Sequence, residues 1–419
     1  MSKRYAIVGG KLIDGTGAAP VENSLVLTDE NGKISYAGPH QELPSEGGYE
    51  VIDAVGKTVM PGIVDTHLHF SGNRTDNDND WVIESNGQKQ ALAVKQAYDA
   101  LTHGLTTVGE IGRNGIAIRD LVNMGEMKGP RIFATGLGFC RVAGHGDSHH
   151  LPLQISKDSH PWGYQADGPW ELRRAIRMRL REEPDAIKIW ATGGGIWRWD
   201  SDRLQLFCSE EIQAIAEECK MVGIPLWAHS YNNFDAAYDC VRFGCTQLIH
   251  GFELDDRTMD LMAEKGTYFT PTIGFLPTWY GTYPPEWTPE LDKFEGETVV
   301  EKGLNRTYQN LRRAHELGVT LTIGSDSFAL VTPYGYVTCD EMISFVENAG
   351  IPVMDTIVAG TLNGAKMLGH EDEFGSLEAG KFADILVING DVINNIRDLN
   401  PDKMDVIMKE GEIVIKNAL

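Results

Sequence analysis

Eight short apolar runs alternate with helix-length amphipathic segments from Pro61 onwards, and this alternation constrains the fold more than any other feature of the sequence. Each run has the length and the residue types of a buried strand, and the segments between them show helical spacing of apolar residues. Strands that alternate with helices are typical of βα units with a parallel sheet. The predicted strands span residues 62–67, 106–111, 131–135, 186–190, 225–229, 247–250, 268–273 and 319–325.

Amphipathic segments of helical length separate these strands. Helices are predicted over residues 210–222, 255–265 and 299–317, and a further helix ends near Leu368. Eight strands with intervening helices favour a (β/α)8 barrel, in which the C-terminal strand ends share one face and usually carry the active site. We therefore predict that residues 61–370 form an α/β barrel.

Both ends of the chain carry a different, β-type pattern. Residues 5–8, 24–28, 33–37 and 51–52 are short β-type runs, separated by turn signals such as Asn31-Gly32. The pattern returns after the last helix, at residues 383–388, 406–408 and 412–415. We expect residues 1–60 and 371–419 to form one discontinuous small β domain beside the barrel.

Charge and composition exclude several classes of function. The chain has 37 Lys and Arg against 60 Asp and Glu, and its formal net charge of −23 disfavours binding to nucleic acid or to an anionic membrane. No stretch reaches the roughly 18 apolar residues of a membrane helix, and the N-terminus turns polar too early for a signal peptide. The six cysteines include no Cys-x-x-Cys pair, so we expect reduced thiols in a cytoplasmic protein.

Residues of metal-ligating type cluster at the ends of the predicted strands. His67 and His69 close the first strand, and their two-residue spacing puts both imidazoles on one side of an extended chain. Further candidates lie at or near the ends of four other strands: Lys188, His229, His250 and Asp326. Because these ends share one face of a barrel, the six side chains are expected to converge.

These residues lie in motifs by which the chain resembles the amidohydrolase superfamily across essentially its whole length. The motifs are PGIVDTHLHF from Pro61, AIKIWATGG from Ala186, the histidines of the fifth and sixth strands, GSDS from Gly324 and GSLEAGKFADILVI from Gly375. The resemblance implies a distorted (β/α)8 TIM barrel with a small β-sandwich domain built from both termini.

In the binuclear branch of that superfamily, a carboxylated lysine bridges two divalent metals. The resemblance assigns the ligands as follows: His67, His69 and Asp326 to the first metal, His229 and His250 to the second, and N6-carboxylated Lys188 to both. The expected metal is zinc, because imidazole suits zinc and a metal pair activates hydroxide and polarises an acyl oxygen. The resemblance makes Asp326 the group that accepts the proton of the hydroxide and passes it to the leaving nitrogen.

Two other interpretations fit the same fold. The mononuclear branch, which includes deaminases and imidazolonepropionase, commonly carries Glu or Gln three residues after the strand-five histidine, where this chain has Asn232. That branch also lacks the bridging lysine, which this chain has as Lys188, so both features favour the binuclear branch. The alternative activity is that of an imidazolonepropionase-like cyclic amidase, or of another small-amide or lactone hydrolase. A non-catalytic amidohydrolase-like scaffold is the third interpretation, and the presence of all six ligands argues against it.

Less specific motifs suggest the class of substrate. GHGD from Gly144, ATGGG from Ala191 and IHGFELDD from Ile249 look most like those of prolidase-like dipeptidases and related carboxypeptidases. The implied reaction is cleavage of the amide bond of dipeptides or N-acyl amino acids, with Xaa-Pro dipeptides as the first choice. The expected partners are such small molecules and, in a homo-oligomer, further copies of the chain.

Loop residues after the third, fourth and fifth strands are candidates for substrate contacts. Arg198 and Arg203 are predicted to bind the substrate carboxylate, and Trp197 is predicted to form an apolar wall of the pocket. His145 and Tyr231 are the candidate catalytic groups, one donating to the acyl oxygen and the other binding the carboxylate.

Overall fold

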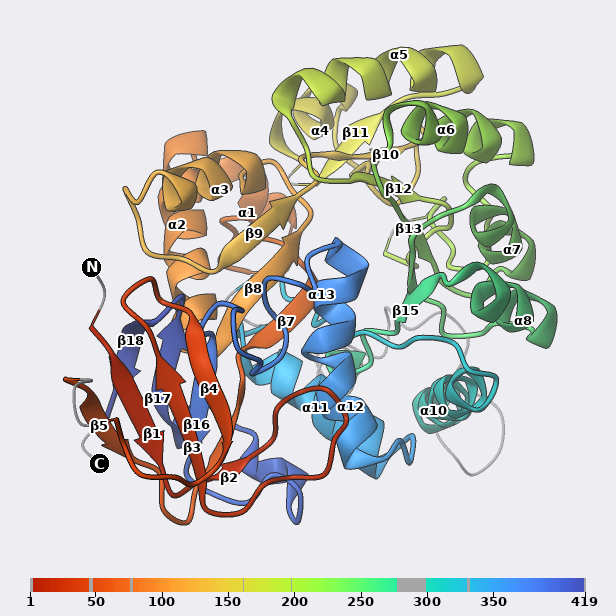
Figure 1. The fold of residues 1–419 in the computed structure, drawn as a ribbon. Helices are drawn as coiled ribbons and strands as arrows, with labels where there is room; N and C mark the ends of the chain where they lie inside the picture. The colour runs from red at the N-terminus through yellow and green to blue at the C-terminus, as the bar shows by residue number, and fades with distance from the viewer. Residues whose placement is uncertain are drawn as a thin grey trace.

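The computed structural model describes residues 3–44, 48–75, 78–160, 162–196, 198–276, 299–329 and 332–417. Two parallel sheets occupy the middle part of the chain (Figure 1). The first sheet has the order β7 (Ile63–Leu68), β8 (Leu105–Glu110) and β9 (Arg131–Ala134). The second has the order β11 (Gly163–Gln165), β10 (Gly138–Cys140), β12 (Ile187–Trp190), β13 (Leu226–Ser230), β14 (Gln247–His250) and β15 (Tyr268–Thr270).

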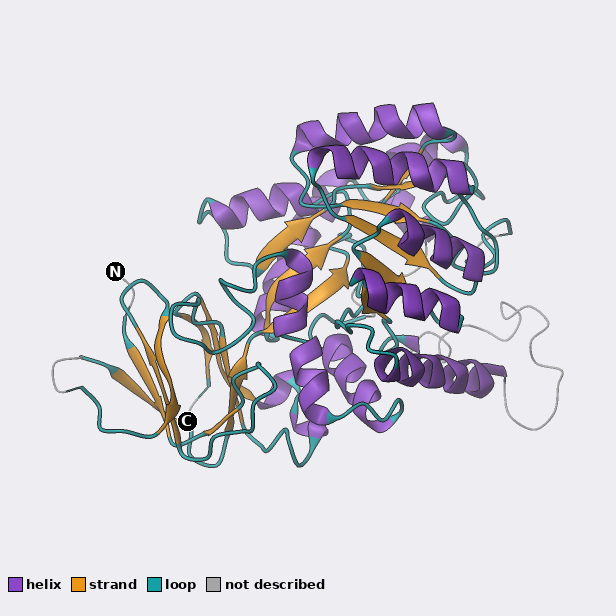
Figure 2. Ribbon diagram, turned by 45° about the vertical axis from the view of Figure 1, so that its right-hand side comes forward, coloured by secondary structure: helices purple, strands orange, loops and turns teal. Residues whose placement is uncertain are grey.

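These strands are buried along their length because both faces of each sheet are covered. Every residue of β7, β8, β12, β13 and β14 is buried, and all pairs in the two sheets run parallel. Helices pack around the outside of the strands (Figure 2). The chain therefore has an α/β fold of the kind in which parallel strands are buried on both faces.

The helices follow the strands in sequence, and their ends carry ordinary capping signals. For example, the Asn233 and Asp255 side chains accept hydrogen bonds from backbone N–H groups of the first turns of α7 and α8, and both helices end at glycines with a left-handed backbone, Gly244 and Gly266. The α-helices of the described residues are α1 (Asp78–Ile83), α2 (Asn86–Thr102), α3 (Gly115–Asn123), α4 (Leu153–Ser159), α5 (Pro169–Arg179), α6 (Ser209–Val222), α7 (Phe234–Phe243), α8 (Asp256–Lys265), α10 (Val299–Glu316), α11 (Tyr336–Glu347), α12 (Val353–Ala359) and α13 (Leu362–Leu368).

Seven of the eight predicted central strands coincide, within a few residues, with β7, β8, β9, β12, β13, β14 and β15. The prediction for the seventh strand runs to residue 273, but β15 ends at Thr270 because Thr272 has a left-handed backbone with φ 52°. The sequence does not predict β10 and β11, since three residues are too few to show a strand periodicity.

The prediction of a regular eighth strand over residues 319–325 is wrong, because this segment forms only an isolated bridge to β15. Backbone hydrogen bonds nevertheless tie it to strands on both sides. Thr322 N–H donates to the Phe269 C=O of β15, and the Thr66 N–H of β7 donates to Ile323 C=O, both at 2.8 Å. Asp326, with φ 56°, then departs from strand geometry. The segment thus lies between β15 and β7 without a continuous ladder to either.

Strands from both ends of the chain form two further sheets. One has the order β4 (Ile34–Pro39), β3 (Ser24–Thr28), β1 (Tyr5–Val8) and β5 (Glu50–Asp53). The other has the order β18 (Glu412–Lys416), β17 (Met404–Lys409), β16 (Ile385–Ile388), β6 (Thr58–Pro61) and β2 (Lys11–Leu12). Residues of both sheets, such as Val26, Ile52, Ile385 and Val406, share one buried apolar cluster. The two sheets formed by the N-terminal and C-terminal segments therefore pack against each other through this cluster.

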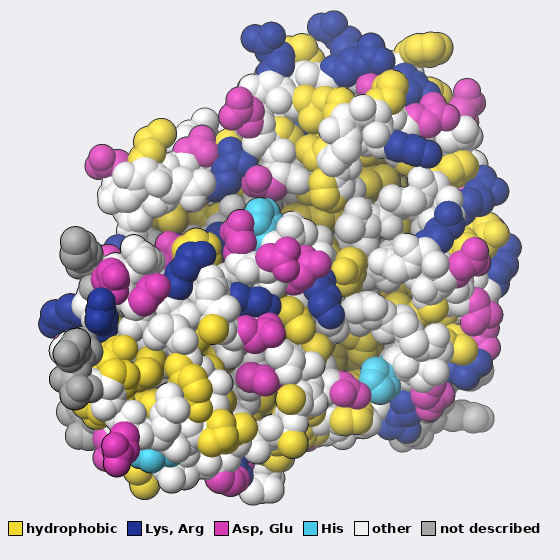
Figure 3. Space-filling view, viewed as in Figure 1, with side chains coloured by type: hydrophobic (Ala, Val, Ile, Leu, Met, Phe, Trp, Pro, Cys, Tyr) yellow, Lys and Arg dark blue, Asp and Glu magenta, His cyan; other side chains and the backbone are white. Residues whose placement is uncertain are grey.

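Charged side chains of both signs cover the surface. Figure 3 shows them interspersed over one face, with a group of basic side chains above α5. Arg173 and Arg177 of α5 form ion pairs with acidic residues of α6, among them Glu218. This pairing agrees with a solvated helix face. Among the described residues, none of the helices has both the length and the apolar composition that crossing a bilayer requires.

Candidate active site

The six predicted ligands meet at the same end of the central strands. His67 lies in β7 and His69 directly after it, Lys188 in β12, His229 in β13 and His250 in β14, and Asp326 follows the segment that ends at residue 325. All except Lys188 line one cavity. The structure therefore brings together side chains that lie far apart in the sequence.

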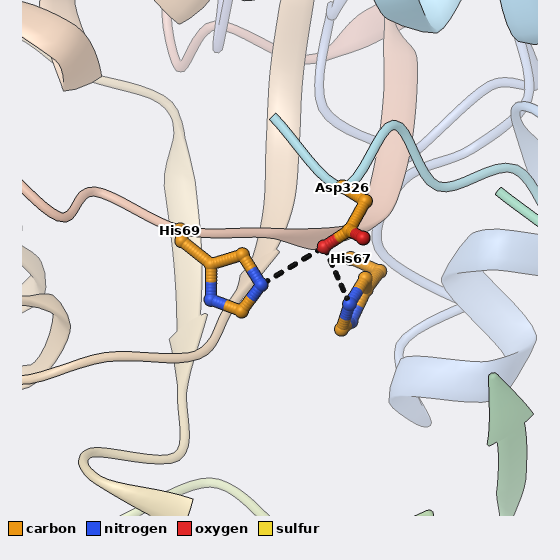
Figure 4. Close-up of side chains that lie close together, drawn as sticks. All are labelled: His67, His69 and Asp326. Carbon is orange, nitrogen blue, oxygen red and sulfur yellow. Dashed lines mark hydrogen bonds and ion pairs between the residues drawn. The ribbon is translucent and has the colours of Figure 1, made fainter. Parts of the chain in front are cut away.

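His67, His69 and Asp326 form the tightest part of this cluster (Figure 4). Asp326 Oδ1 lies 3.1 Å from His67 Nε2 and 3.0 Å from His69 Nε2. His69 Nδ1 lies 2.6 Å from the carbonyl oxygen of Ile111, which can only accept, so Nδ1 carries a proton and donates this hydrogen bond. Among the described residues, these are the three ligand-type side chains whose donor atoms all lie within 4.8 Å of one another.

His229 and His250 form a second pair on the neighbouring strands. Their ring centroids are 4.5 Å apart, and the His250 ring lies 5.3 Å from that of His67. His250 Nδ1 is 2.6 Å from Thr272 Oγ1, which holds the ring in place. His250 and Thr272 both have positive φ values, 72° and 52°, which is unusual for residues other than glycine and often marks a functional site.

Lys188 is close enough to both pairs to interact electrostatically with His67 and His229, and it is 1% exposed. Within the described residues Nζ has no hydrogen-bond partner, although it lies 5.5 Å from the centroid of the Trp190 ring. Burial lowers the pKa of Lys188 to about 7. A buried amine of this kind is costly as an unpaired ammonium, so the site favours its neutral or covalently modified form.

Burial also keeps three of the histidines, His67, His229 and His250, neutral. It lowers the pKa of His67 to about 3, with a further contribution from Lys188, and it lowers the pKa values of His229 and His250 well below the usual range. Burial raises the pKa of Asp326, but hydrogen bonds with His67 and other nearby charges outweigh it and hold this pKa well below its usual value. Neutral imidazoles beside an ionised carboxylate are the donor set of a divalent metal.

His145 reaches the cavity from the loop after β10. Its Nδ1 lies 2.9 Å from Asp200 Oδ2, and its ring stacks on that of His229 with centroids 4.8 Å apart. Asp200 is fully buried, and its carboxylate also accepts hydrogen bonds from the backbone N–H groups of Gly194 and Ile196. The carboxylate thus joins two loops and fixes the orientation of the imidazole.

Aromatic side chains form opposite walls of the cavity. Tyr231 lies beside His229 and His250, and its ring stacks on Phe252 at 4.7 Å. On the other side, Trp162 lies 5.3 Å from the ring of His69 and 5.9 Å from that of Phe328. The cavity therefore combines a polar floor with apolar walls, as small-molecule sites commonly do.

The predicted substrate-binding residues lie elsewhere or outside the described residues. Arg198 and Arg203 are exposed, and neither lines the described part of the cavity. The Arg198 guanidinium lies 4.8 Å from the centroid of the Trp199 ring. Trp197 falls outside the described residues. The substrate-binding role of these three residues stays a prediction.

Sequence reasoning missed two buried carboxylates that hold the site together. One is Asp200, described above. The other is Asp65, whose Oδ1 accepts hydrogen bonds from the backbone N–H groups of His67 (3.1 Å) and Ser325 (3.2 Å). Burial raises the pKa of Asp65 to about 6, against the effect of its hydrogen bonds. Asp65 lies two residues before His67 on the same strand, so both side chains face the same side of the sheet, and this spacing could have pointed to Asp65. Asp200 lies in an irregular loop and gives no such signal.

The residues fit a divalent metal centre. His67 Nδ1 and Lys188 Nζ are buried polar atoms without hydrogen-bond partners among the described residues, and leaving such atoms unpaired costs about 1–3 kcal/mol each. Asp326 Oδ1 faces Nε2 of both His67 and His69, so two imidazole nitrogens and a carboxylate oxygen point at one place. Ligand atoms of these types are those that a divalent metal such as zinc binds.

Comparison of the sequence with known proteins finds relatives that match almost all of the chain. It is 26% identical to ochratoxinase from Aspergillus niger over 439 aligned positions, which cover 98% of this chain and 87% of that protein. It is 23% identical to imidazolonepropionase from Caldanaerobacter subterraneus subsp. tengcongensis, covering 93% of this chain and 90% of that one.

Solved structures give the same result. The fold superimposes on a Xaa-Pro dipeptidase with methionine bound in its active site, with a TM-score of 0.84, 30% identity and coverage of 99% of this chain and 100% of the other. Residues 58–414 match the Amidohydrolase family, whose members are generally metal-dependent and act on small molecules. The chain belongs to the Amidohydrolase family and is a hydrolytic enzyme.

Proposed function

We propose that this enzyme is a binuclear metal-dependent amidohydrolase that cleaves the amide bond of dipeptides or N-acyl amino acids, with Xaa-Pro dipeptides as its preferred class. The observation that carries the proposal is the convergence of ligand-type side chains from five separate segments: five of them line one cavity, and the sixth, Lys188, is buried next to them. The 30% identity to a Xaa-Pro dipeptidase over nearly the full length of both chains supports the choice of substrate.

The metal ligands in this proposal are those that the structure brings together. His67, His69 and Asp326 hold one divalent metal, His229 and His250 hold the other, and carboxylated Lys188 contributes to both, with zinc as the metal. When bound, such a metal pair supplies an activated hydroxide and polarises the substrate carbonyl. The buried, unpartnered Nζ of Lys188 supports its modification, because a carbamate replaces an unpaired cation by an anion that metals can neutralise.

The remaining chemistry belongs to side chains of the chain itself. Asp326 accepts a proton at its carboxylate and donates it to the leaving nitrogen, acting first as base and then as acid. His145, oriented by Asp200, donates a hydrogen bond from Nε2 to the substrate acyl oxygen or carboxylate when both of its ring nitrogens are protonated, because Nδ1 faces the Asp200 carboxylate. Tyr231 lies against His229 and His250 and takes the other of these two roles.

The same strands support a proposal for the whole fold. The segment 319–327 is hydrogen-bonded to both β15 and β7, which supports closure of the central strands into one distorted (β/α)8 barrel over residues 61–370. The shared apolar cluster of the two terminal sheets supports a small β-sandwich domain over residues 1–60 and 371–419.

Metal content tests the binuclear centre. Protein purified after growth with zinc is expected to hold about two zinc ions per chain by elemental analysis, because the ligands divide into two sets that share Lys188. Exhaustive treatment with a chelator is expected to abolish hydrolysis, and addition of zinc is expected to restore it. A content that never exceeds one per chain would contradict the metal pair and would favour the mononuclear alternative.

Recognition of the substrate carboxylate tests the substrate class. We expect kcat/KM for a Xaa-Pro dipeptide to exceed that for its C-terminal amide about 10- to 100-fold, since one hydrogen bond to a charged group contributes roughly 1.5–3 kcal/mol. The comparison is repeated with His145→Ala and Arg198→Ala, and the preference is expected to disappear in whichever variant has lost the carboxylate contact. Equal hydrolysis of acid and amide by the unaltered enzyme would instead favour a cyclic amide or lactone as substrate.

A further inference from the structure

We propose that Tyr334, Thr338 and Glu341 form a single support that sets the positions of the metal ligands on three different segments, an inference that rests on the metal-dependent function proposed above. Thr338 and Glu341, three residues apart, lie on one face of α11, and Tyr334 lies in the turn just before this helix. Val337 N–H bonds to Pro333 C=O across that turn, which ties the residues before α11 to its first turn. All three side chains are buried, with exposed fractions of 2%, 0% and 0%.

Tyr334 acts on the first ligand pair. Its hydroxyl donates to the backbone carbonyl of His69 at 2.7 Å. On the other side of the same residue, His69 N–H donates to Ser327 C=O at 2.8 Å, and the imidazole Nδ1 donates to Ile111 C=O. The backbone and the ring of His69 are therefore fixed by separate hydrogen bonds. Tyr334 provides the hydrogen bond to the backbone carbonyl.

Thr338 acts on His67 and on the segment that carries Asp326. Its hydroxyl donates to Asp65 Oδ2 at 2.7 Å. The other oxygen of Asp65 accepts from the N–H groups of His67 and Ser325. One carboxylate thus connects β7 with the residue before Asp326, and Thr338 holds that carboxylate in place.

Glu341 acts on His250 through the turn after β15. Its carboxylate accepts a hydrogen bond from the backbone N–H of Gly274 at 2.5 Å, and it lies close enough to the backbone N–H groups of Thr272 and Ile273 to be stabilised by them as well. The turn packs so closely on α11 that a Cβ at Gly274 would lie 2.5 Å from the backbone nitrogen of Glu341. Thr272, held in its left-handed conformation, then contacts His250 Nδ1 through Oγ1. Glu341 is therefore a positioning residue for a ligand that it does not touch.

The three hydrogen-bonded side chains come from a single short stretch of chain, and they act on ligands of both proposed metals. One stretch of eight residues, Tyr334–Glu341, supports His69, then His67 with Asp326, and then His250. Outer hydrogen bonds of this kind orient ligands, and their loss typically lowers metal affinity about 10- to 100-fold. A common support also fixes the two halves relative to each other, which separate supports would not do.

The test compares zinc release from the full-length, zinc-loaded protein and its variants. Tyr334→Phe, Thr338→Val and Glu341→Gln are each expected to lose zinc to a chelator about 10- to 100-fold faster than the unaltered protein. Thr338→Ser keeps the hydroxyl and is expected to restore slow release. Cobalt-loaded Tyr334→Phe and Thr338→Val are expected to show altered visible absorption, because the ligand geometry changes.

Tyr336→Phe is the matched control. Its hydroxyl also makes one hydrogen bond from the same helix, but to Asp402 Oδ1 at 2.6 Å and away from the ligand segments. The control is expected to release zinc at the normal rate. Normal release and an unchanged cobalt spectrum in Tyr334→Phe and Thr338→Val would overturn the support, as would release that only follows the loss in Tm of the metal-free variants. Failure of the unaltered protein to bind metal would instead refute the proposed function, so the two failures are distinguishable.

Discussion

Replacing Lys188 by alanine is expected to remove most of the bound metal and to lower kcat/KM by more than about 100-fold, which exceeds the usual effect of changing an outer hydrogen bond. The side chain is buried, its Nζ has no hydrogen-bond partner among the described residues, and it interacts electrostatically with His67 and His229. In the proposed site its carbamate is the anion that both metals share. The truncated side chain leaves a space without that anion.

Rescue by a small anion distinguishes this role from a structural one. Bicarbonate or a short carboxylic acid such as propionate is expected to restore part of both the metal content and the activity of Lys188→Ala, because either can supply the missing negative charge. Lys89→Ala is the control, since Lys89 is the other buried lysine of the described residues and lies on the helix α2 rather than on a strand that carries a proposed ligand. Full activity and metal content in Lys188→Ala would show that the lysine is not a ligand.

Replacing Asp326 by asparagine is expected to lower kcat for amide substrates about 10²- to 10⁴-fold, the usual range for loss of a proton-transferring group. Asparagine keeps the shape of the side chain and tolerates the left-handed backbone found at this position, φ 56°. It does not accept and return a proton as a carboxylate does. Elemental analysis of the variant is needed alongside the kinetics, because Asp326 is also a proposed ligand.

The nature of the leaving group separates proton transfer from metal binding. If Asp326 donates the proton to the leaving nitrogen, Asp326→Asn should slow hydrolysis of an amide much more than that of an aryl ester with the same acyl group, since a phenolate leaves without a proton. Loss of metal alone would slow both substrates equally. An equal effect on ester and amide, at full metal content, would contradict the role of Asp326 as acid.

The strands could be predicted from the sequence because local patterns determine them. Strands buried on both faces appear as continuous apolar runs, and β7, β12 and β14 are found within about a residue of their predicted positions. The segment 319–325 has the same apolar pattern, yet its hydrogen bonds alternate between β15 and β7 and no ladder forms. Pairing of that kind depends on the surrounding strands and leaves no trace in the local sequence.

The site could be predicted only in its innermost part. His67, His69 and Asp326 lie at strand ends, where position alone predicts convergence. Asp200 comes from an irregular loop, and its contact with His145 depends on how two loops pack against each other. The cationic contact expected from Arg198 rests on the same kind of loop, and the structure places that side chain at the surface. Loop conformation, rather than residue type, sets the limit of the sequence analysis.

The sheet that unites the two ends of the chain determines when the site can be completed during synthesis. β6 leads directly into β7, and it is anchored by β16, with Thr58 Oγ1 of β6 donating to Gly390 C=O across 332 positions. A nascent chain exposes His67 and His69 long before it has made this anchor. Contacts so distant in sequence form slowly. A growing chain therefore carries its first ligand pair on an unanchored strand until the last strands emerge from the ribosome. During that time the pair is open to premature binding of cations and the strand to non-native pairing.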